Sequence, residues 1–150
     1  MGPMELLSRR QRQSTPLRFC RYLIDLIGRH YPGVMPAVLW VRSDSTYYRL
    51  LPCSRLWNAR RDARTYPGPW PVICHPPCGP WGKYKHNCHH SKLDGIIAMN
   101  MVHVWGGIVE HPVGSSLFRE HGRGGEILKF DQGDFGHRVP KPTLLYCVWH

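Results

Sequence analysis

Residues 71–78 read Pro-Val-Ile-Cys-His-Pro-Pro-Cys, and this stretch decides how we expect the chain to fold. The apolar run from Val72 to Cys74 is typical of a short buried strand. Proline fixes φ and restricts the residue before it, so the strand is expected to run into a rigid turn that carries Cys78. In open α/β sheets, ligands bind at the carboxyl ends of the strands. The stretch therefore predicts a buried strand that presents a thiol at a site.

Further short apolar runs and two helical patterns lie on either side of this stretch. Strands are expected at residues 37–41, 53–58, 71–74, 108–109, 127–130 and 144–148. One helix is predicted to start at Thr15-Pro16, with Thr15 as N-cap, and to stop at Gly28 and Pro32-Gly33. A second is predicted to open with the capping-box variant of residues 91–94 and to end at Gly106-Gly107.

Strands that alternate with helices predict the α/β class. We expect residues 15–150 to form a single domain, a small three-layer sandwich with a mostly parallel, Rossmann-like sheet and helices on its faces. Residues 1–14 are expected to form a flexible basic tail. A length of 150 residues suits one domain, and a hydrophobic fraction of 42% excludes a wholly disordered chain.

No apolar run reaches the ~18–20 residues that span a membrane, so no membrane partner is expected. No secretory signal pattern is visible, so the six cysteines are expected to be reduced thiols in a cytoplasm rather than a disulfide framework. The oligomeric state is left open, because a small sheet can borrow an element from another subunit.

The net charge of +10 is concentrated in residues 1–64, which hold 12 arginines and four acidic residues. Such a basic half is the electrostatic footprint expected for a nucleic-acid or nucleotide partner, because each neutralised phosphate releases counterions. The alternative is a solvated basic surface without a polyanion partner.

Polar residues gather where three of the expected strands end. Arg42, Asp44 and Ser45 follow the first strand, residues 75–78 follow the third, and Glu110 follows the strand after the second helix. This convergence predicts a site, although ordinary polar loops would give the same composition.

The chemistry at that site would centre on Cys78. A thiol on a rigid turn suits a nucleophile, and a nearby cation such as His75 would lower its pKa. The carboxylate of Glu110 can accept a hydrogen bond from a cytosine amino group. The alternative is a structural turn with an inert thiol.

The same segment also allows a metal site. Cys74, Cys78, Cys88 and His90 supply the ligand types and the number that tetrahedral zinc takes, and a zinc-bound Cys78 could not act as a nucleophile.

Basic and aromatic residues in two loops are candidate nucleic-acid contacts. Lys83 and Lys85 could contact phosphates, and Trp81 could stack on a base, although core packing is the more frequent role of tryptophan. A second basic loop before the last strand supplies His137, Arg138 and Lys141.

Three segments carry a resemblance to a known group of proteins. They are HPPCGPWG (75–82), GGIVEHPVGSSLF (106–118) and DFGHRVPKPTLLYCV (134–148), preceded by VRSDSTY (41–47) and ARRDARTYPGPWPVI (59–73). In order and spacing they resemble small phage and prophage proteins, which in turn resemble a reduced core of cytosine-C5 DNA methyltransferases.

The resemblance implies a methyltransferase-like fold, a host-cell cytoplasmic location and a DNA rather than an RNA partner. In that family a Pro-Cys loop attacks C6 of a flipped cytosine, which Pro77-Cys78 resembles. A Glu-Asn turn holds the base edge, and Glu110 stands at the matching position. Arg42, Asp44, Ser45 and Asp62 would then line the side that takes S-adenosylmethionine.

The sequence departs from that family at three points. Residues 42–45 replace the glycine-rich loop that follows the first strand, His111 replaces the Asn, and the chain leaves no room for a target-recognition domain. A second hypothesis therefore stands beside the first: a non-catalytic module, stabilised by zinc, that binds nucleic acid or a host protein.

Overall fold

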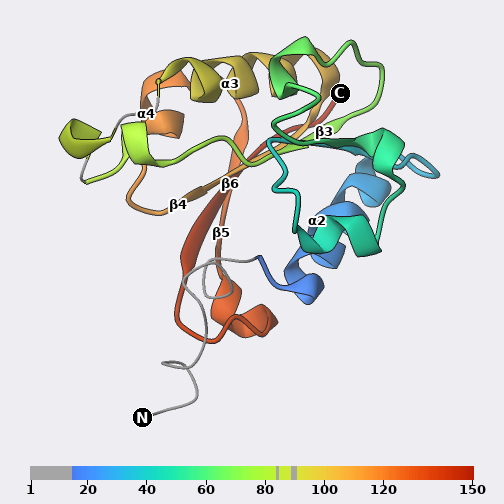
Figure 1. Cartoon of the computed structure of the whole chain (residues 1–150), viewed down its shortest axis with the longest axis horizontal. Helices are drawn as coiled ribbons and strands as arrows, with labels where there is room; N and C mark the ends of the chain where they lie inside the picture. The colour runs from blue at the N-terminus through green and yellow to red at the C-terminus, as the bar shows by residue number, and fades with distance from the viewer. Residues whose placement is uncertain (1–14, 84, 89–90) are drawn as a thin grey trace.

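The computed structural model describes residues 15–83, 85–88 and 91–150, which form a six-stranded sheet with helices on both of its faces (Figure 1). The strands are β1 (Ala37–Leu39), β2 (Leu56–Trp57), β3 (Val72–Cys74), β4 (Gly107–Pro112), β5 (Glu126–Asp131) and β6 (Pro142–Val148). The α-helices are α2 (Leu17–His30), α3 (Leu93–Trp105) and α4 (Leu117–His121). Short 3-10 helices are η2 (Thr46–Arg49), η3 (Cys53–Arg55), η4 (Ala63–Thr65), η5 (Gly79–Trp81), η6 (Lys85–Asn87) and η7 (Gln132–Phe135).

The strand order is β2-β1-β3-β4-β6-β5, and the sheet is mixed. The first four strands in this order run parallel, as predicted for an α/β chain. Strand β6 is antiparallel to both β4 and β5. The physical reason is the connection: β5 and β6 are joined only by η7 and a loop, whereas a parallel pair needs a longer crossover.

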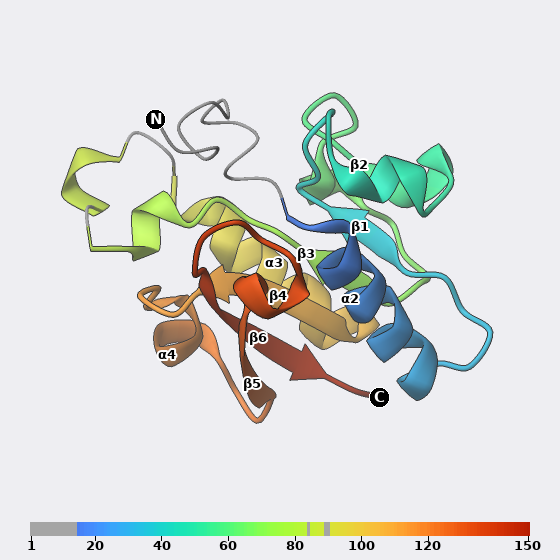
Figure 2. The same cartoon turned by 90° about the horizontal axis from the view of Figure 1, so that it is seen from below.

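Two hydrophobic clusters cover the two faces of the sheet. Successive side chains of a strand point to opposite faces, so Val72 and Cys74 pack in the cluster that contains α3, and Ile73 packs in the cluster that contains α2. Figure 2 shows α2 on one side of the sheet and α3 on the other. The central strands are therefore buried on both faces, which explains their continuous apolar sequence.

A close backbone approach joins β3 to β4. Gly107 has a φ of +123°, and a Cβ at this position would lie 2.0 Å from the carbonyl oxygen of Val72. No other residue type fits there without moving a strand. This contact sets β4 beside β3 and so brings the ends of the two strands together.

Several element boundaries differ from the prediction. Helix α2 begins at Leu17 without a side-chain cap and continues through Gly28 to His30. Only Leu56 and Trp57 of the expected strand 53–58 pair in the sheet, because η3 takes up the residues before them. The predicted basic tail, residues 1–14, lies outside the described residues. None of the helices described is both long and apolar enough to span a membrane.

Candidate functional site

The candidate site lies at the carboxyl edge of the parallel strands. Residues 75–78 leave β3 at this edge, and Glu110 lies near the end of β4. Because β6 runs in the opposite direction, the loop that precedes it reaches the same edge. Lys141 of this loop is close enough for its positive charge to lower the pKa of both Cys78 and Glu110. The predicted convergence of these segments is therefore present in the fold.

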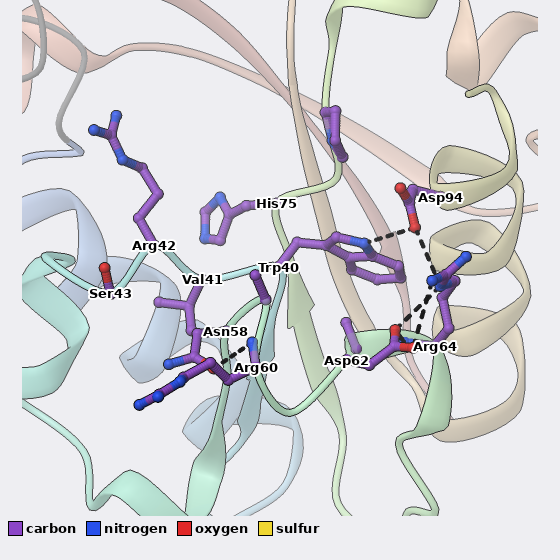
Figure 3. Close-up of a pocket in the computed structure, with 13 residues that line it drawn as sticks. Trp40, Val41, Arg42, Ser43, Asn58, Arg60, Asp62, Arg64, His75 and Asp94 are labelled. Carbon is purple, nitrogen blue, oxygen red and sulfur yellow. Dashed lines mark hydrogen bonds and ion pairs between the residues drawn. The ribbon is translucent and has the colours of Figure 1, made fainter. Parts of the chain in front are cut away.

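A cavity of about 840 Å³ opens beside the ends of β1, β2 and β3 (Figure 3). Strand β1 has β2 on one side and β3 on the other, so the strand order reverses here, which is where open α/β sheets bind ligands. In Figure 3, Arg42 and Ser43 lie on one side of the cavity, and Asp62 and Asp94 lie on the other. The lining residues are Trp40–Ser43, Asn58–Arg60, Asp62–Arg64, His75, Pro77 and Asp94.

Two lining residues have unusual backbone conformations. Trp40 and Asp62 have φ values of +59° and +60°, in the left-handed region that residues other than glycine seldom adopt. Such strain is concentrated at functional sites and persists only where the surroundings enforce it. The indole Nε1 of Trp40 donates a hydrogen bond to Asp94 at 3.0 Å, which holds the ring against the start of α3.

The charges around the cavity are partly paired. Arg64 binds Asp62 at 3.1 Å and approaches Asp94 at 3.9 Å. This arginine holds the pKa of Asp62 below its ordinary value through side-chain and backbone hydrogen bonds. Arg42 pairs with Asp44 at 3.3 Å, and Arg42 but not Asp44 is among the lining residues of the cavity.

Ser45 does not line the cavity, although it was predicted on the cofactor side. Its hydroxyl accepts a hydrogen bond from the backbone N–H of Tyr47 at 3.2 Å and so caps η2. The role of Ser45 is to start the turn that presents Tyr47 to the site.

A hydrogen-bonded network lies behind the cavity, with His75 at its centre. Nδ1 of His75 donates to Glu110 at 3.1 Å, and the side chains of the two residues are only 15% and 12% exposed. Nε2 lies 3.0 Å from the hydroxyl of the buried Tyr47, which donates to it when the ring is neutral. His75 therefore joins the cavity wall to a buried carboxylate.

Both carboxylate oxygens of Glu110 have protein donors. Oε2 accepts from His75, and Oε1 accepts from the buried Gln132 at 3.2 Å. Burial alone would raise the pKa of Glu110, but the hydrogen bond and charge of His75, with the charge of Lys141, lower it below its ordinary value. Glu110 is thus a buried carboxylate that stays ionised because of its partners.

His111 fixes the turn that carries Cys78. Its Nε2 donates to the carbonyl oxygen of Pro76 at 3.0 Å, and its Nδ1 lies 2.7 Å from the hydroxyl of Ser115. Burial lowers the pKa of His111, which favours the neutral ring that this pattern requires. His111, which stands where the proteins that this sequence resembles have Asn, is therefore buried and supports the turn.

Cys78 is exposed at the end of this turn. Its pKa is raised above the ordinary value, first by partial burial and then by the negative charge of Glu110, while Lys141 acts in the opposite direction. The predicted lowering of this pKa by a neighbouring cation is present as the contribution of Lys141, but burial and the charge of Glu110 outweigh it. Cys78 therefore lies near Glu110, but as a thiol rather than a thiolate.

Two of the predicted nucleic-acid contacts, Trp81 and His137, also make contacts within the fold. Trp81 is only 2% exposed and packs in the core beside Gly95, so its ring cannot stack on a base. Nδ1 of His137 contacts its own loop at the carbonyl oxygen of Val139, 2.8 Å away. Lys83, Lys85 and Arg138 are exposed, and Lys141 is half-buried.

The predicted zinc ligands that the structure describes differ in burial. Cys74 is fully buried in the core cluster beneath α3, and Cys88 is half-buried near Cys78. His90 lies outside the described residues. Among the residues that are described, no group of three histidine, cysteine or acidic side chains has the arrangement of a metal site.

Sequence reasoning missed several residues of the site. Asp94 was expected to cap α3, yet it accepts from Trp40, while Ser91 accepts the hydrogen bond of Leu93. No sequence pattern around Tyr47 or Gln132 indicates a functional residue, because both side chains reach the site only through contacts with distant segments. Arg60 was recognisable only as part of a charged run.

Comparisons of this chain with protein-family models, with curated proteins and with solved structures find no match.

Proposed function

We propose that the protein binds a nucleotide or nucleoside ligand in the cavity at the ends of β1, β2 and β3, and acts on nucleic acid, DNA in the first place. The observation that carries this proposal is the position of a charged cavity where the strand order reverses. The parallel half, in the order β2-β1-β3-β4, supports a Rossmann-like interpretation, because doubly wound sheets place nucleotides at this point.

The lining supplies the groups that a nucleoside ligand needs. Trp40 offers an aromatic surface, Asp62 and Asp94 offer acceptors for hydroxyl groups, and Arg42 and Arg60 offer positive charge for an anionic group. A volume of about 840 Å³ falls within the range of roughly 300–1,000 Å³ typical of small-molecule sites.

S-adenosylmethionine is the ligand that the sequence resemblance suggests, and the volume and the charged lining of the cavity support this choice. Asp62 and Asp94 would accept from the hydroxyl groups, and Arg60 would pair with the carboxylate. When bound, this ligand supplies a methyl group. The backbone after β1 turns at Trp40, in a conformation that a glycine-rich loop would adopt without strain.

Cytosine is the proposed target base, with Cys78 as nucleophile. The thiolate sulfur would add to C6 of the ring, so that the electron pair of the C5–C6 π bond becomes available at C5. Loss of the C5 proton and elimination of the Cys78 thiolate would then restore the double bond and free the enzyme. Support comes from the proximity of Cys78, Glu110 and Lys141. For Glu110 to hold the base edge, it would use lone pairs not already engaged by His75 and Gln132.

Calorimetry tests the ligand proposal. We expect S-adenosylmethionine or S-adenosylhomocysteine to bind with measurable heat, and Asp62→Asn or Arg60→Gln to weaken binding on the order of tenfold, which corresponds to about 1.4 kcal/mol. Asn suits Asp62 because it tolerates the left-handed backbone. Asp25→Asn, on the exposed side of α2, is the matched control. No heat with either compound, nor with adenosine or ATP, would exclude a nucleoside site here.

Trapping on DNA that contains 5-fluorocytosine tests the base chemistry. With saturating S-adenosylmethionine we expect a covalent protein–DNA adduct on a denaturing gel, lost in Cys78→Ser and kept in Cys53→Ser, whose thiol is also exposed. An adduct that survives Cys78→Ser, or no adduct at all, would contradict the assigned nucleophile.

The alternative is a zinc-stabilised, non-catalytic module that binds nucleic acid or a host protein. The proximity of Cys78 and Cys88 favours it, since both belong to the proposed ligand set with Cys74 and His90. Metal analysis of the purified protein separates the hypotheses: stoichiometric zinc that is lost in Cys88→Ser would support the module and leave Cys78 unavailable as a nucleophile.

A further inference from the structure

Two cysteines lie in neighbouring turns just beyond β3, and the sulfur of one packs beside the residue that follows the other. Cys78 precedes η5, and Cys88 follows η6. Two backbone hydrogen bonds precede Cys88: Lys85 N–H donates to the carbonyl oxygen of Gly82 at 3.2 Å, and Cys88 N–H donates to that of Lys85 at 3.3 Å. Residues ten positions apart in sequence are brought back together.

Gly79 makes the approach possible. A Cβ at Gly79 would lie 2.6 Å from the sulfur of Cys88, closer than real Cβ contacts allow. The Cys88 sulfur thus packs directly on the backbone of the residue that follows Cys78.

The pair is also accessible, which distinguishes it from most of the other cysteines. Cys78 is exposed and Cys88 is partly exposed, whereas three further cysteines are buried among apolar side chains: Cys20, Cys74 and Cys147. Cys53 is exposed on η3, in a separate segment, and provides an internal reference for oxidant access.

We propose that Cys78 and Cys88 form a reversible disulfide when the protein meets a peroxide. The deprotonated fraction of Cys78 attacks a peroxide oxygen, the O–O bond breaks, and hydroxide leaves, which gives a sulfenic acid. The Cys88 thiolate then attacks this sulfur, the S–O bond breaks and a second hydroxide leaves. Each hydroxide takes up one thiol proton, so two thiols are oxidised and hydrogen peroxide is reduced to two waters.

The disulfide would switch off the proposed base chemistry. It removes the Cys78 sulfur as a nucleophile and locks the turn that continues from Pro77, a residue of the cavity wall. This consequence rests on the proposed function, but the formation of the disulfide does not. The two can therefore fail separately.

Peptide mapping tests the pair directly. The full chain, first treated with a chelator, is exposed to hydrogen peroxide, alkylated and digested with trypsin. We expect a cross-linked pair of peptides, residues 65–83 with residues 86–92, that loses two hydrogen atoms in mass and is restored by dithiothreitol. Fragmentation of the pair assigns the bond to Cys78 rather than to the buried Cys74.

Three variants make the result decisive. Cys88→Ser should abolish the cross-link, while Cys53→Ser should leave it unchanged. Gly79→Ala keeps both thiols but places a methyl group where the Cys88 sulfur lies, so the rate of disulfide formation should fall several-fold in a protein whose circular dichroism is unaltered. A cross-link through Cys74 or Cys53, or irreversible oxidation of Cys78 without a cross-link, would overturn the proposal. A cross-link without any 5-fluorocytosine adduct in the reduced protein would refute only the proposed base chemistry.

Discussion

His75 connects the two parts of the candidate site at the scale of single residues. One edge of its ring faces the cavity, and its two nitrogens contact Tyr47 and Glu110. The hydrogen bond between His75 and Glu110 joins the ends of β3 and β4, and loss of His75 would leave the buried carboxylate without one of its two protein donors. We infer that the pair holds the ends of β3 and β4 in a fixed relation.

The pH dependence of the free energy of unfolding should reveal how much the Glu110 carboxylate contributes to stability. Because the folded protein lowers the pKa of Glu110, its ionised form stabilises the fold above the ordinary glutamate pKa of about 4.3, and this contribution is lost as the pH falls through the lowered value. In urea unfolding, the Glu110→Gln substitution should therefore lower the free energy of unfolding most near neutral pH. In acid, the free energies of unfolding of the variant and the parent protein should become similar.

Glu126→Gln, at an exposed position of the edge strand β5, is the control for the acid titration and should change little at any pH. A Glu110→Gln variant whose loss of stability stays constant down to the acid transition would show that the carboxylate contributes no pH-dependent stability.

At the scale of elements, α2 and α3 differ in what their glycines meet. A Cβ at Gly28 in α2 would have nothing within 4 Å, whereas a Cβ at Gly95 in α3 would lie 2.5 Å from Nε1 of the buried Trp81. The close packing of α3 on Trp81 is what fixes the start of this helix, and with it Asp94, beside the cavity. The two helices should therefore respond in opposite directions to the same substitution.

Gly28→Ala is expected to stabilise the protein by roughly 0.5–1 kcal/mol, because alanine removes the entropic penalty of glycine in a helix. Gly95→Ala is expected to destabilise it by roughly 1–3 kcal/mol, because the methyl group overpacks a buried ring. Urea unfolding of both variants measures the two free energies. A neutral Gly95→Ala would mean that α3 or Trp81 can shift at little cost.

At the scale of the whole molecule, the basic half of the chain carries less available charge than its composition indicates. Arg55 stacks on Trp70 with its guanidinium carbon 3.2 Å from the ring centre, and Arg61 stacks on Trp57 at 3.6 Å. Arg61 also donates to three backbone carbonyl groups. These arginines stabilise the segment around β2, so the number of basic residues does not by itself measure a nucleic-acid surface.

Three lysines outside these stacks lie in segments at the edge of the sheet that carries the proposed site. Exposed Lys83 and Lys85 follow Cys78 in the chain, and Lys141 reaches the same edge from the loop before β6. This common edge results from the topology, since an antiparallel last strand begins where the parallel strands end. Any nucleic acid at Cys78 would lie between these two basic segments.

The sequence by itself determined the α/β class, the central strands and the position of Cys78 after a proline turn. Each depends on a local property: a continuous apolar run, or the restricted φ of proline. The strand pairings, the cavity and the contacts of Tyr47, Asp94 and Gln132 were decided only by the tertiary structure. They join segments far apart in the chain, and their geometry depends on how two hydrophobic clusters pack on opposite faces of one sheet. Trp81 illustrates the same limit of sequence-based prediction. An aromatic residue beside a polar turn can either stack on a base or pack in the core, and only the packing of α3 against the Trp81 ring decides between the two.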